Sequence, residues 1–244
     1  WITRDLRLHD NPGLVQAAGA DLLLCVFVVD PRWFQPGPFQ CQPLGLHRWR
    51  FLWGSLMALD DALRARGNRL HIAWGTPEQA LPALCRGSAI DELHRARLPG
   101  TQEGQQWAAV CEAVPGVRAR QHEALTLFQE PDLPFGLEAL PATFSAFRRQ
   151  LEKSDLQPQP PLPAPDTLPS APGLDQDARS QCPAITPGPA RPDFLPGEAA
   201  ALGHWHQYLW QDQHITHYKD TRNALEDWPS SSKLSPWLAQ GCLS

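Results

Sequence analysis

Serine hydroxyls gather near the carboxyl end of the sequence, where they are suited to binding a phosphate group. Ser231 and Ser232 stand directly before residues 233–241, whose composition predicts a short helix. Serine is favoured at a helix amino end, proline is tolerated in the first turn, and glycine often ends a helix. A helix amino end accepts phosphate readily because it presents unpaired N–H groups and partial positive charge. With the phenol or ring face of Tyr218 nearby, the segment suits a phosphate-bearing cofactor.

An ordinary capped helix is the alternative, and the short Ser-Ser-x-x-Ser-Pro pattern alone favours it. The longer pattern from Tyr218 to Ser244 changes that balance. Its parts, Tyr-Lys-Asp-Thr-Arg-Asn and Ser-Ser-Lys-Leu-Ser-Pro-Trp-Leu-Ala-Gln-Gly-Cys, resemble the flavin-binding segment of the photolyase/cryptochrome family and, within it, the DASH cryptochromes. The resemblance implies that the phosphates of FAD are held by Tyr218, Ser231, Ser232, Lys233, Leu234 and Ser235.

Other stretches resemble further parts of the same family. Residues 1–14 resemble its opening strand and turn, and residues 44–52 resemble the start of its long second helix. Segments between residues 122 and 149 resemble the run into its interdomain connector. Several separated motifs in matching order are far more specific than one short motif. The resemblance therefore covers most of the chain, apart from a proline-rich middle.

The resemblance implies light-driven chemistry on DNA. In the family, light-excited reduced flavin passes an electron to a cyclobutane pyrimidine dimer, which splits and returns the electron, and DASH members favour single-stranded DNA. Lys219 and Arg222 suit a flavin or DNA phosphate, but surface ion pairs with Asp220 or Glu226 carry about even weight. The resemblance favours a DNA contact for Arg222. A blue-light photoreceptor without repair activity and a non-flavin interaction fragment stay open as alternatives.

A second chromophore is less well supported by the sequence. Relatives often hold a folate antenna, 5,10-methenyltetrahydrofolate, which a glutamate after the fourth strand helps to bind. Arg97 stands at the matching place here. A positive charge in place of a hydrogen-bond acceptor argues against the antenna, unless Glu92 or Glu103 compensates.

The remaining pattern predicts the elements that position these residues. A continuous apolar run over residues 21–30 predicts a strand buried on both faces. Further strands are predicted at 69–74, 90–94 and 117–121, with helices over 46–66, from Thr76 onward and over 102–114. Strands and helices that alternate at this spacing predict an α/β fold with a doubly wound parallel sheet. Without a Gly-x-Gly-x-x-Gly or Walker-type loop, this domain is not expected to bind NAD or ATP.

Composition divides the chain into three expected parts. Residues 1–130 are expected to form the α/β (antenna) domain, and residues 131–196 an interdomain connector that is proline-rich from about residue 154. The stretch from Ser154 to Pro196 holds 12 of the 26 prolines, which excludes a helix or central strand there. Residues 197–244 are expected to be the first part of an all-helical FAD-binding domain.

The chain is expected to be truncated at both ends and inactive by itself. Met57 is the only methionine. In the family, the adenine pocket, the residue facing flavin N5, the tryptophan electron chain and the DNA cavity all lie beyond the position of Ser244. Without those packing partners, apolar side chains are expected to be exposed. These are Leu202, Trp205, Leu209 and Trp237.

Composition also narrows the class of protein. A net charge of −5 over 244 residues does not indicate a general nucleic-acid binder. Six scattered cysteines without a Cys-x-x-Cys pair predict free thiols in a reducing compartment. No apolar run is long enough to span a membrane and no signal peptide is visible, which predicts an intracellular protein in cytoplasm, nucleus or organelle.

Four histidines in one short stretch do not predict a metal site. His204 and His206 would point to opposite sides of a helix. His214 and His217 share a face, but no cysteine or carboxylate pair completes a ligand set.

Overall fold

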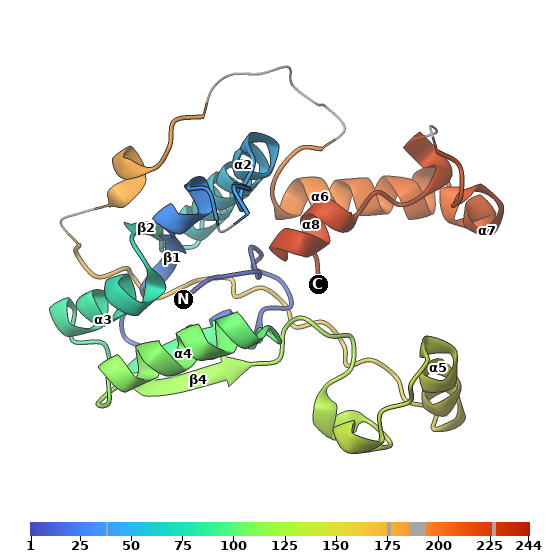
Figure 1. The fold of residues 1–244 in the computed structure, drawn as a ribbon, viewed down its shortest axis with the longest axis horizontal. Coiled ribbons are helices and arrows are strands. Elements are labelled where there is room, and N and C mark those ends of the chain that lie inside the picture. Colours follow the sequence, from blue (N-terminus) through green and yellow to red (C-terminus); the bar gives the residue numbers. More distant parts are fainter. Residues whose placement is uncertain (38, 175–176, 186–193, 226–227) are drawn as a thin grey trace.

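The computed structural model describes the chain except residues 38, 175–176, 186–193 and 226–227 (Figure 1). Strands and helices alternate along its first half, and this confirms the predicted α/β class. These elements are α1 (Pro12–Ala17), β1 (Cys25–Val29), α2 (Leu46–Arg64), β2 (Leu70–Trp74), α3 (Pro77–Gly87), β3 (Glu92–Ala96), α4 (Thr101–Ala113) and β4 (Arg118–His122). The predicted strand at residues 90–94 lies two residues later, and the other predicted boundaries differ by four residues or fewer.

The strands form two parallel pairs that the first two residues join. β1 pairs with β2, and β3 pairs with β4. Between the pairs, the Ile2 N–H donates to the Val26 carbonyl at 2.8 Å, and the Trp1 amino group donates to the His94 carbonyl at 2.8 Å. The spatial order is therefore β2, β1, residues 1–2, β3, β4. The direction of strand addition reverses at residues 1–2, which is the arrangement of a doubly wound sheet.

The two faces of the sheet carry separate apolar cores. Alternate residues of β1 point to opposite faces, and all five are at most 4% exposed. Phe27 and Val29 pack with α1 and α2 in a first cluster, which also includes Leu56 and Leu63. Val26 and Val28 pack with α3 and α4 in a second cluster, which includes Leu81, Leu93 and Val110. Because both faces are covered, β1 needs the continuous apolar run seen in the sequence.

The described residues between Pro165 and Pro183 of the proline-rich chain lie back along the α/β part as a strap. Although proline has no N–H to donate, its carbonyl oxygen still accepts a hydrogen bond. The Arg66 Nε donates to the Pro165 carbonyl at 2.9 Å, and the Trp49 Nε1 donates to the Pro183 carbonyl at 3.1 Å. Arg179 anchors the same segment through an ion pair with buried Asp60 at 2.9 Å. Before the strap, η2 (Glu130–Asp132), η3 (Leu137–Ala139) and α5 (Phe144–Lys153) lie to one side of the sheet (Figure 1).

The chain after Gly197 is helical but interrupted. Its segments are α6 (Glu198–His206), a π-helical turn (Gln207–Gln211), a 3-10 turn (His214–His217), α7 (Tyr218–Thr221), η7 (Trp228–Ser230) and α8 (Ser235–Gln240). In Figure 1 they lie at the upper right, above α5.

Trp237 contradicts the expectation that its side chain is exposed. It is 1% exposed, and its Nε1 donates to the Leu195 carbonyl at 2.9 Å. Phe51 of α2, Phe194 of the connector and His204 of α6 surround its ring, so other residues of this chain supply its packing partners. Leu202 and Trp205 are each 40% exposed, as expected. Leu209 is only partly exposed.

Candidate cofactor-binding site

The serine-rich loop is fixed against the carboxyl-terminal helices by its carbonyl groups. His204 of α6 donates from Nε2 to the Ser232 carbonyl at 2.7 Å. The Thr221 hydroxyl of α7 donates to the Ser230 carbonyl at 2.9 Å. Thr221 lies one turn after Tyr218, so the structure brings the helix of Tyr218 and the serine loop together. Both hydrogen bonds are accepted by backbone carbonyls, so neither of them uses a serine hydroxyl.

The hydroxyls of Ser231, Ser232 and Ser235 have no hydrogen-bond partner in the part of the chain that the structure describes. The prediction that Ser231 or Ser232 caps the helix is wrong. α8 begins only at Ser235, its N-cap is Leu234, and no side chain caps it. Lys233 adopts a left-handed conformation (φ +52°), and this turn separates the two serines from the helix. Gly241 ends the helix with φ +70°, as predicted.

The donor set of the loop fits a phosphate group, although the helix contributes little. With six residues, α8 is too short for an appreciable dipole. Three free hydroxyls and the Lys233 ammonium, all within five residues, provide donors and positive charge instead. Leu234 is 8% exposed and packs into the first cluster, so its side chain anchors the loop and makes no polar contact.

Tyr218 and Arg222 lie on the surface of α7. Tyr218 is 38% exposed, and Arg222 is exposed one turn further along. The alternative ion pairs with Asp220 are absent from the described residues, where neither Lys219 nor Arg222 has a carboxylate partner. Glu226 lies outside the described residues. Among the described residues, both cations are therefore available to a phosphate.

Sequence reasoning missed Tyr208. It is 4% exposed, yet its hydroxyl has no partner among the described residues. Burial raises the pKa of this phenol, and its ring lies 5.8 Å from the ring of His214. The π-helical turn at Gln207–Gln211 sets its orientation, and no sequence pattern indicated that turn.

The histidines of this region make contacts of other kinds. His204 stacks on Trp237 with ring centroids 4.9 Å apart, besides its bond to Ser232. His214 lies 3.7 Å from an Asp212 carboxylate oxygen. Across the described residues, no group of three His, Cys, Asp or Glu side chains is placed to hold a metal ion. Among all the described residues, no helix is long and apolar enough to cross a membrane.

Arg97, at the expected antenna position, is engaged in ion pairs. Its guanidinium lies 2.8 Å from Glu123 and 3.6 Å from Glu130, at the edge of a cavity of about 620 Å³. The two acids named as substitutes are also engaged, since Glu92 pairs with Arg118 at 2.7 Å and Glu103 lies 3.5 Å from Arg4.

Fold and sequence together define the class of protein. The sequence profile described as DNA photolyase matches residues 1–166. The chain belongs to the DNA photolyase family.

Its similar relatives narrow this class further. The chain is 36% identical to the cryptochrome DASH of Idiomarina loihiensis, with 98% of this chain and 53% of that protein covered. It is 35% identical to the cryptochrome DASH of Gloeobacter violaceus, over the whole chain and 50% of that protein. The crystal structure of a Synechocystis cryptochrome matches the whole chain and 52% of that structure, with a TM-score of 0.92 at 31% identity. The chain thus spans about half the length of the curated relatives it matches.

Proposed function

We propose that this chain is part of an FAD-dependent cryptochrome of the DASH kind that repairs cyclobutane pyrimidine dimers in single-stranded DNA under blue light. The observation that carries the proposal is the set of partner-free serine hydroxyls on a loop whose carbonyls are already held. Hydroxyls that are fixed in place and unpaired are ready to donate to an anion at little ordering cost. Membership of the photolyase family and similarity to DASH cryptochromes support the same reaction class.

The loop residues have separate roles in holding FAD. The hydroxyls of Ser231, Ser232 and Ser235 donate to the phosphates, and the Lys233 ammonium supplies positive charge. Leu234 anchors the loop in the apolar core, and Tyr218 offers its phenol from α7. When bound, FAD would absorb the light and exchange the electron.

Arg222 is the proposed DNA contact of this chain. It is exposed on α7 and unpaired among the described residues, so its guanidinium can bind a backbone phosphate. With a net charge of −5 over the chain, DNA affinity has to come from such local cations.

The three-part division predicted from composition is also part of the proposal. Residues 1–130 form the α/β domain, residues 131–196 the connector, and residues 197–244 the first part of the FAD-binding domain. We infer an intracellular location, which the six free cysteines support. A folate antenna is not included, because Arg97 pairs with Glu123 and Glu130 where an acceptor is expected.

A flavin titration tests the assignment of the serine loop. FAD is titrated into the chain and into the double variant Ser231→Ala/Ser232→Ala, with binding followed by quenching of flavin fluorescence. Loss of two hydrogen bonds to a charged group is expected to weaken binding at least about tenfold. Ser145→Ala, an exposed serine on α5, is the control and keeps the parent affinity. Equal affinity in the parent and the double variant would refute the assignment.

Repair is tested separately from flavin binding. The chain alone is expected not to split dimers in single-stranded oligonucleotide under blue light, because it spans only about half the length of the relatives it matches. Light-dependent splitting by residues 1–244 would overturn this expectation. In a longer form, flavin retention without any repair would favour the photoreceptor alternative.

A further inference from the structure

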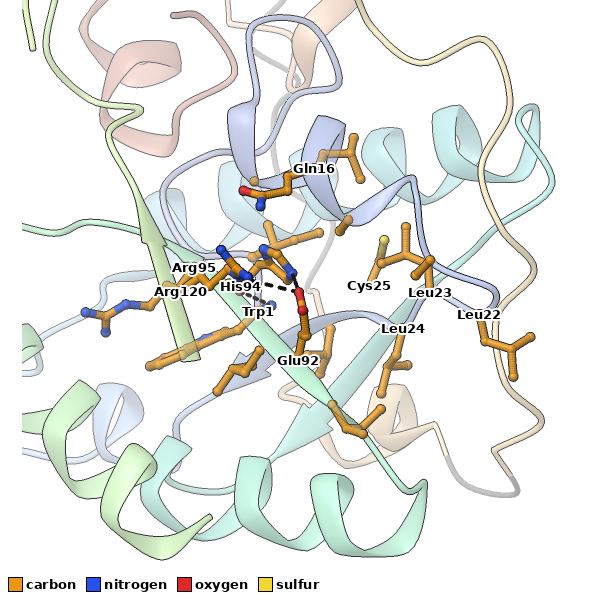
Figure 2. Close-up of a pocket in the computed structure, with 18 of the residues that line it drawn as sticks. Trp1, Gln16, Leu22, Leu23, Leu24, Cys25, Glu92, His94, Arg95 and Arg120 are labelled. Carbon is orange, nitrogen blue, oxygen red and sulfur yellow. Dashed lines mark hydrogen bonds and ion pairs between the residues drawn. The ribbon is translucent and has the colours of Figure 1, made fainter. Parts of the chain in front are cut away.

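Arg95 and Tyr208 each bury donor atoms that make no hydrogen bond within the described residues. A buried donor has lost its contacts with water, so it normally has a compensating interaction. Arg95 has one, because its guanidinium carbon lies 4.9 Å from the ring centre of Trp1 and 4.7 Å from that of Trp107. Figure 2 shows Arg95 and Trp1 among the residues that line a cavity of about 690 Å³. No comparable interaction reaches the Tyr208 hydroxyl in the described part of the chain.

Tyr208 lies near Tyr218, the other of the two tyrosines in this chain. The π-helical turn at Gln207–Gln211 contacts the 3-10 turn at His214–His217, which leads directly into α7 and Tyr218. Gln213 adopts a left-handed conformation (φ +50°) and turns the chain between the two segments. Burial raises the pKa of the Tyr208 phenol, and the neighbouring phenol of Tyr218 raises it further.

The two phenols differ in their access to a ligand. Tyr208 is 4% exposed and its oxygen is fully enclosed, so an anion in solvent does not reach it. Tyr218 is 38% exposed. It shares α7 with Thr221, whose hydroxyl donates to the Ser230 carbonyl beside the serine loop at 2.9 Å. Tyr218 is therefore the residue through which the buried hydroxyl can act on a phosphate held by that loop.

We propose that Tyr208 is a positioning residue for the phosphate site. Its hydroxyl donates to the phenol oxygen of Tyr218 when FAD binds, and the hydroxyl of Tyr218 then donates to a phosphate. A hydroxyl that already accepts a hydrogen bond is a stronger donor, because hydrogen bonds in a chain polarise one another. The inference rests on the proposed FAD site, and it explains why the Tyr208 hydroxyl has no partner before FAD binds.

Loss of the Tyr208 hydroxyl should affect stability and binding differently. Tyr208→Phe keeps the ring and removes a buried donor without a partner, so the melting temperature is expected to stay unchanged or to rise by up to about 3 °C. FAD binding, followed by quenching of flavin fluorescence, is expected to weaken about fivefold, which corresponds to one hydrogen bond.

Ser55→Ala is the matched control, because the buried Ser55 hydroxyl has partners. It donates to the Phe51 carbonyl at 2.8 Å and accepts from the Gly197 N–H at 3.2 Å. This variant is expected to lower the melting temperature by about 2–4 °C and to keep the parent affinity for FAD.

A double-mutant cycle tests whether Tyr208 acts through Tyr218. If it does, Tyr208→Phe weakens FAD binding no further once Tyr218→Phe is present. Labelling with 3-fluorotyrosine gives one ¹⁹F resonance for each of the two tyrosines, and the two single variants assign them. FAD is expected to shift the Tyr208 resonance in the parent protein and to leave it unshifted in Tyr218→Phe.

The outcomes separate this inference from the proposed function. Three results would each overturn the inference and leave the FAD site in place: a melting temperature of Tyr208→Phe as low as that of Ser55→Ala, an unchanged affinity, or additive losses in the double variant. A parent chain that does not bind FAD would overturn the serine-loop assignment and this inference with it. Weaker binding without lower stability, lost in the Tyr218→Phe background, would confirm the role of Tyr208.

Discussion

The α/β part and the helices after Gly197 contain similar apolar side chains but enclose them very differently. Leu56, Leu63 and Ile72 are completely buried between helices and sheet. In the helical region, Trp210 is 68% exposed and Leu225 is 99% exposed. An apolar side chain is therefore buried only where a helix or strand of the chain packs over it. Its hydrophobicity alone does not ensure burial. Exposed apolar side chains of this kind are common where a surface contacts another element or a partner.

Trp237 is the point at which the two regions share one core. Its ring contacts Phe51 from α2 and His204 from α6, so it joins elements far apart in sequence. The stability of the helical region is therefore expected to depend on a few such contacts.

The largest predicted effect contrasts two tryptophans of the same region. Trp237→Ala removes a fully buried ring and is expected to lower the free energy of unfolding by about 3–5 kcal/mol. Trp210→Ala removes a ring that is 68% exposed and is expected to cost less than about 1 kcal/mol. Urea denaturation measures both. Similar losses would show that the exposed fraction of each ring does not determine its contribution to stability.

A smaller effect is expected at Glu198, which ties α6 to the first segment. Its carboxylate accepts from the N–H groups of Leu8 at 2.8 Å and His9 at 3.1 Å, and from the His9 ring. Burial opposes ionisation, but these hydrogen bonds outweigh it and lower the pKa of Glu198 below its ordinary 4.5. Glu198→Gln is expected to lower the free energy of unfolding by about 1–3 kcal/mol at pH 7.

The pH dependence follows from the direction of that shift. A lowered pKa stabilises the fold above pH 4.5, and the stabilisation disappears as the pH falls through the lowered pKa. The difference between parent and Glu198→Gln should therefore narrow in this acid range, as followed by thermal unfolding at several pH values. Glu138→Gln, an exposed control on η3, should match the parent throughout. A gap that stays constant down to pH 3 would contradict the role of the carboxylate.

The smallest predicted effect concerns Lys233, where stability and binding oppose each other. Lys233→Gly relieves a left-handed backbone and is expected to raise the free energy of unfolding by about 1 kcal/mol. Loss of the ammonium should weaken FAD binding in the fluorescence titration. Lys219→Gly on α7 is the control and should instead lower stability by about 0.5–1 kcal/mol. A Lys233→Gly protein that binds FAD as tightly as the parent would exclude Lys233 from the phosphate site.

The sequence predicted the α/β part well because its determinants are local. The continuous apolar run at β1 and the helical spacing over α2 depend on residues within a few positions of one another. The burial of Trp237 and the position of Tyr208 could not be predicted in this way. The burial of Trp237 depends on Phe51, nearly 190 residues away. The position of Tyr208 depends on a π-helical turn that no sequence pattern indicates.

The serine loop was predicted from the sequence only in part. Its residues and their order indicated a phosphate site, but the capping geometry assigned to them was wrong. One left-handed residue, Lys233, moves the helix start to Ser235. Local propensity predicted the carboxyl end of α8 at Gly241 but missed the turn before its amino end, since residue types other than glycine disfavour that conformation.

The buried contacts at Gly241 constrain the order in which this protein matures. The Leu6 N–H donates to Gln240, and the guanidinium of Arg7, which is 1% exposed, donates to Gly241 at 3.1 Å across 234 positions. A side chain added at Gly241 would collide with the backbone of Arg4. During synthesis from the amino end, Arg7 therefore lacks one of its acceptors until Gly241 has left the ribosome. Residues 4–7 therefore reach their final contacts long after they are made, and the nascent chain depends on protection from aggregation throughout that interval.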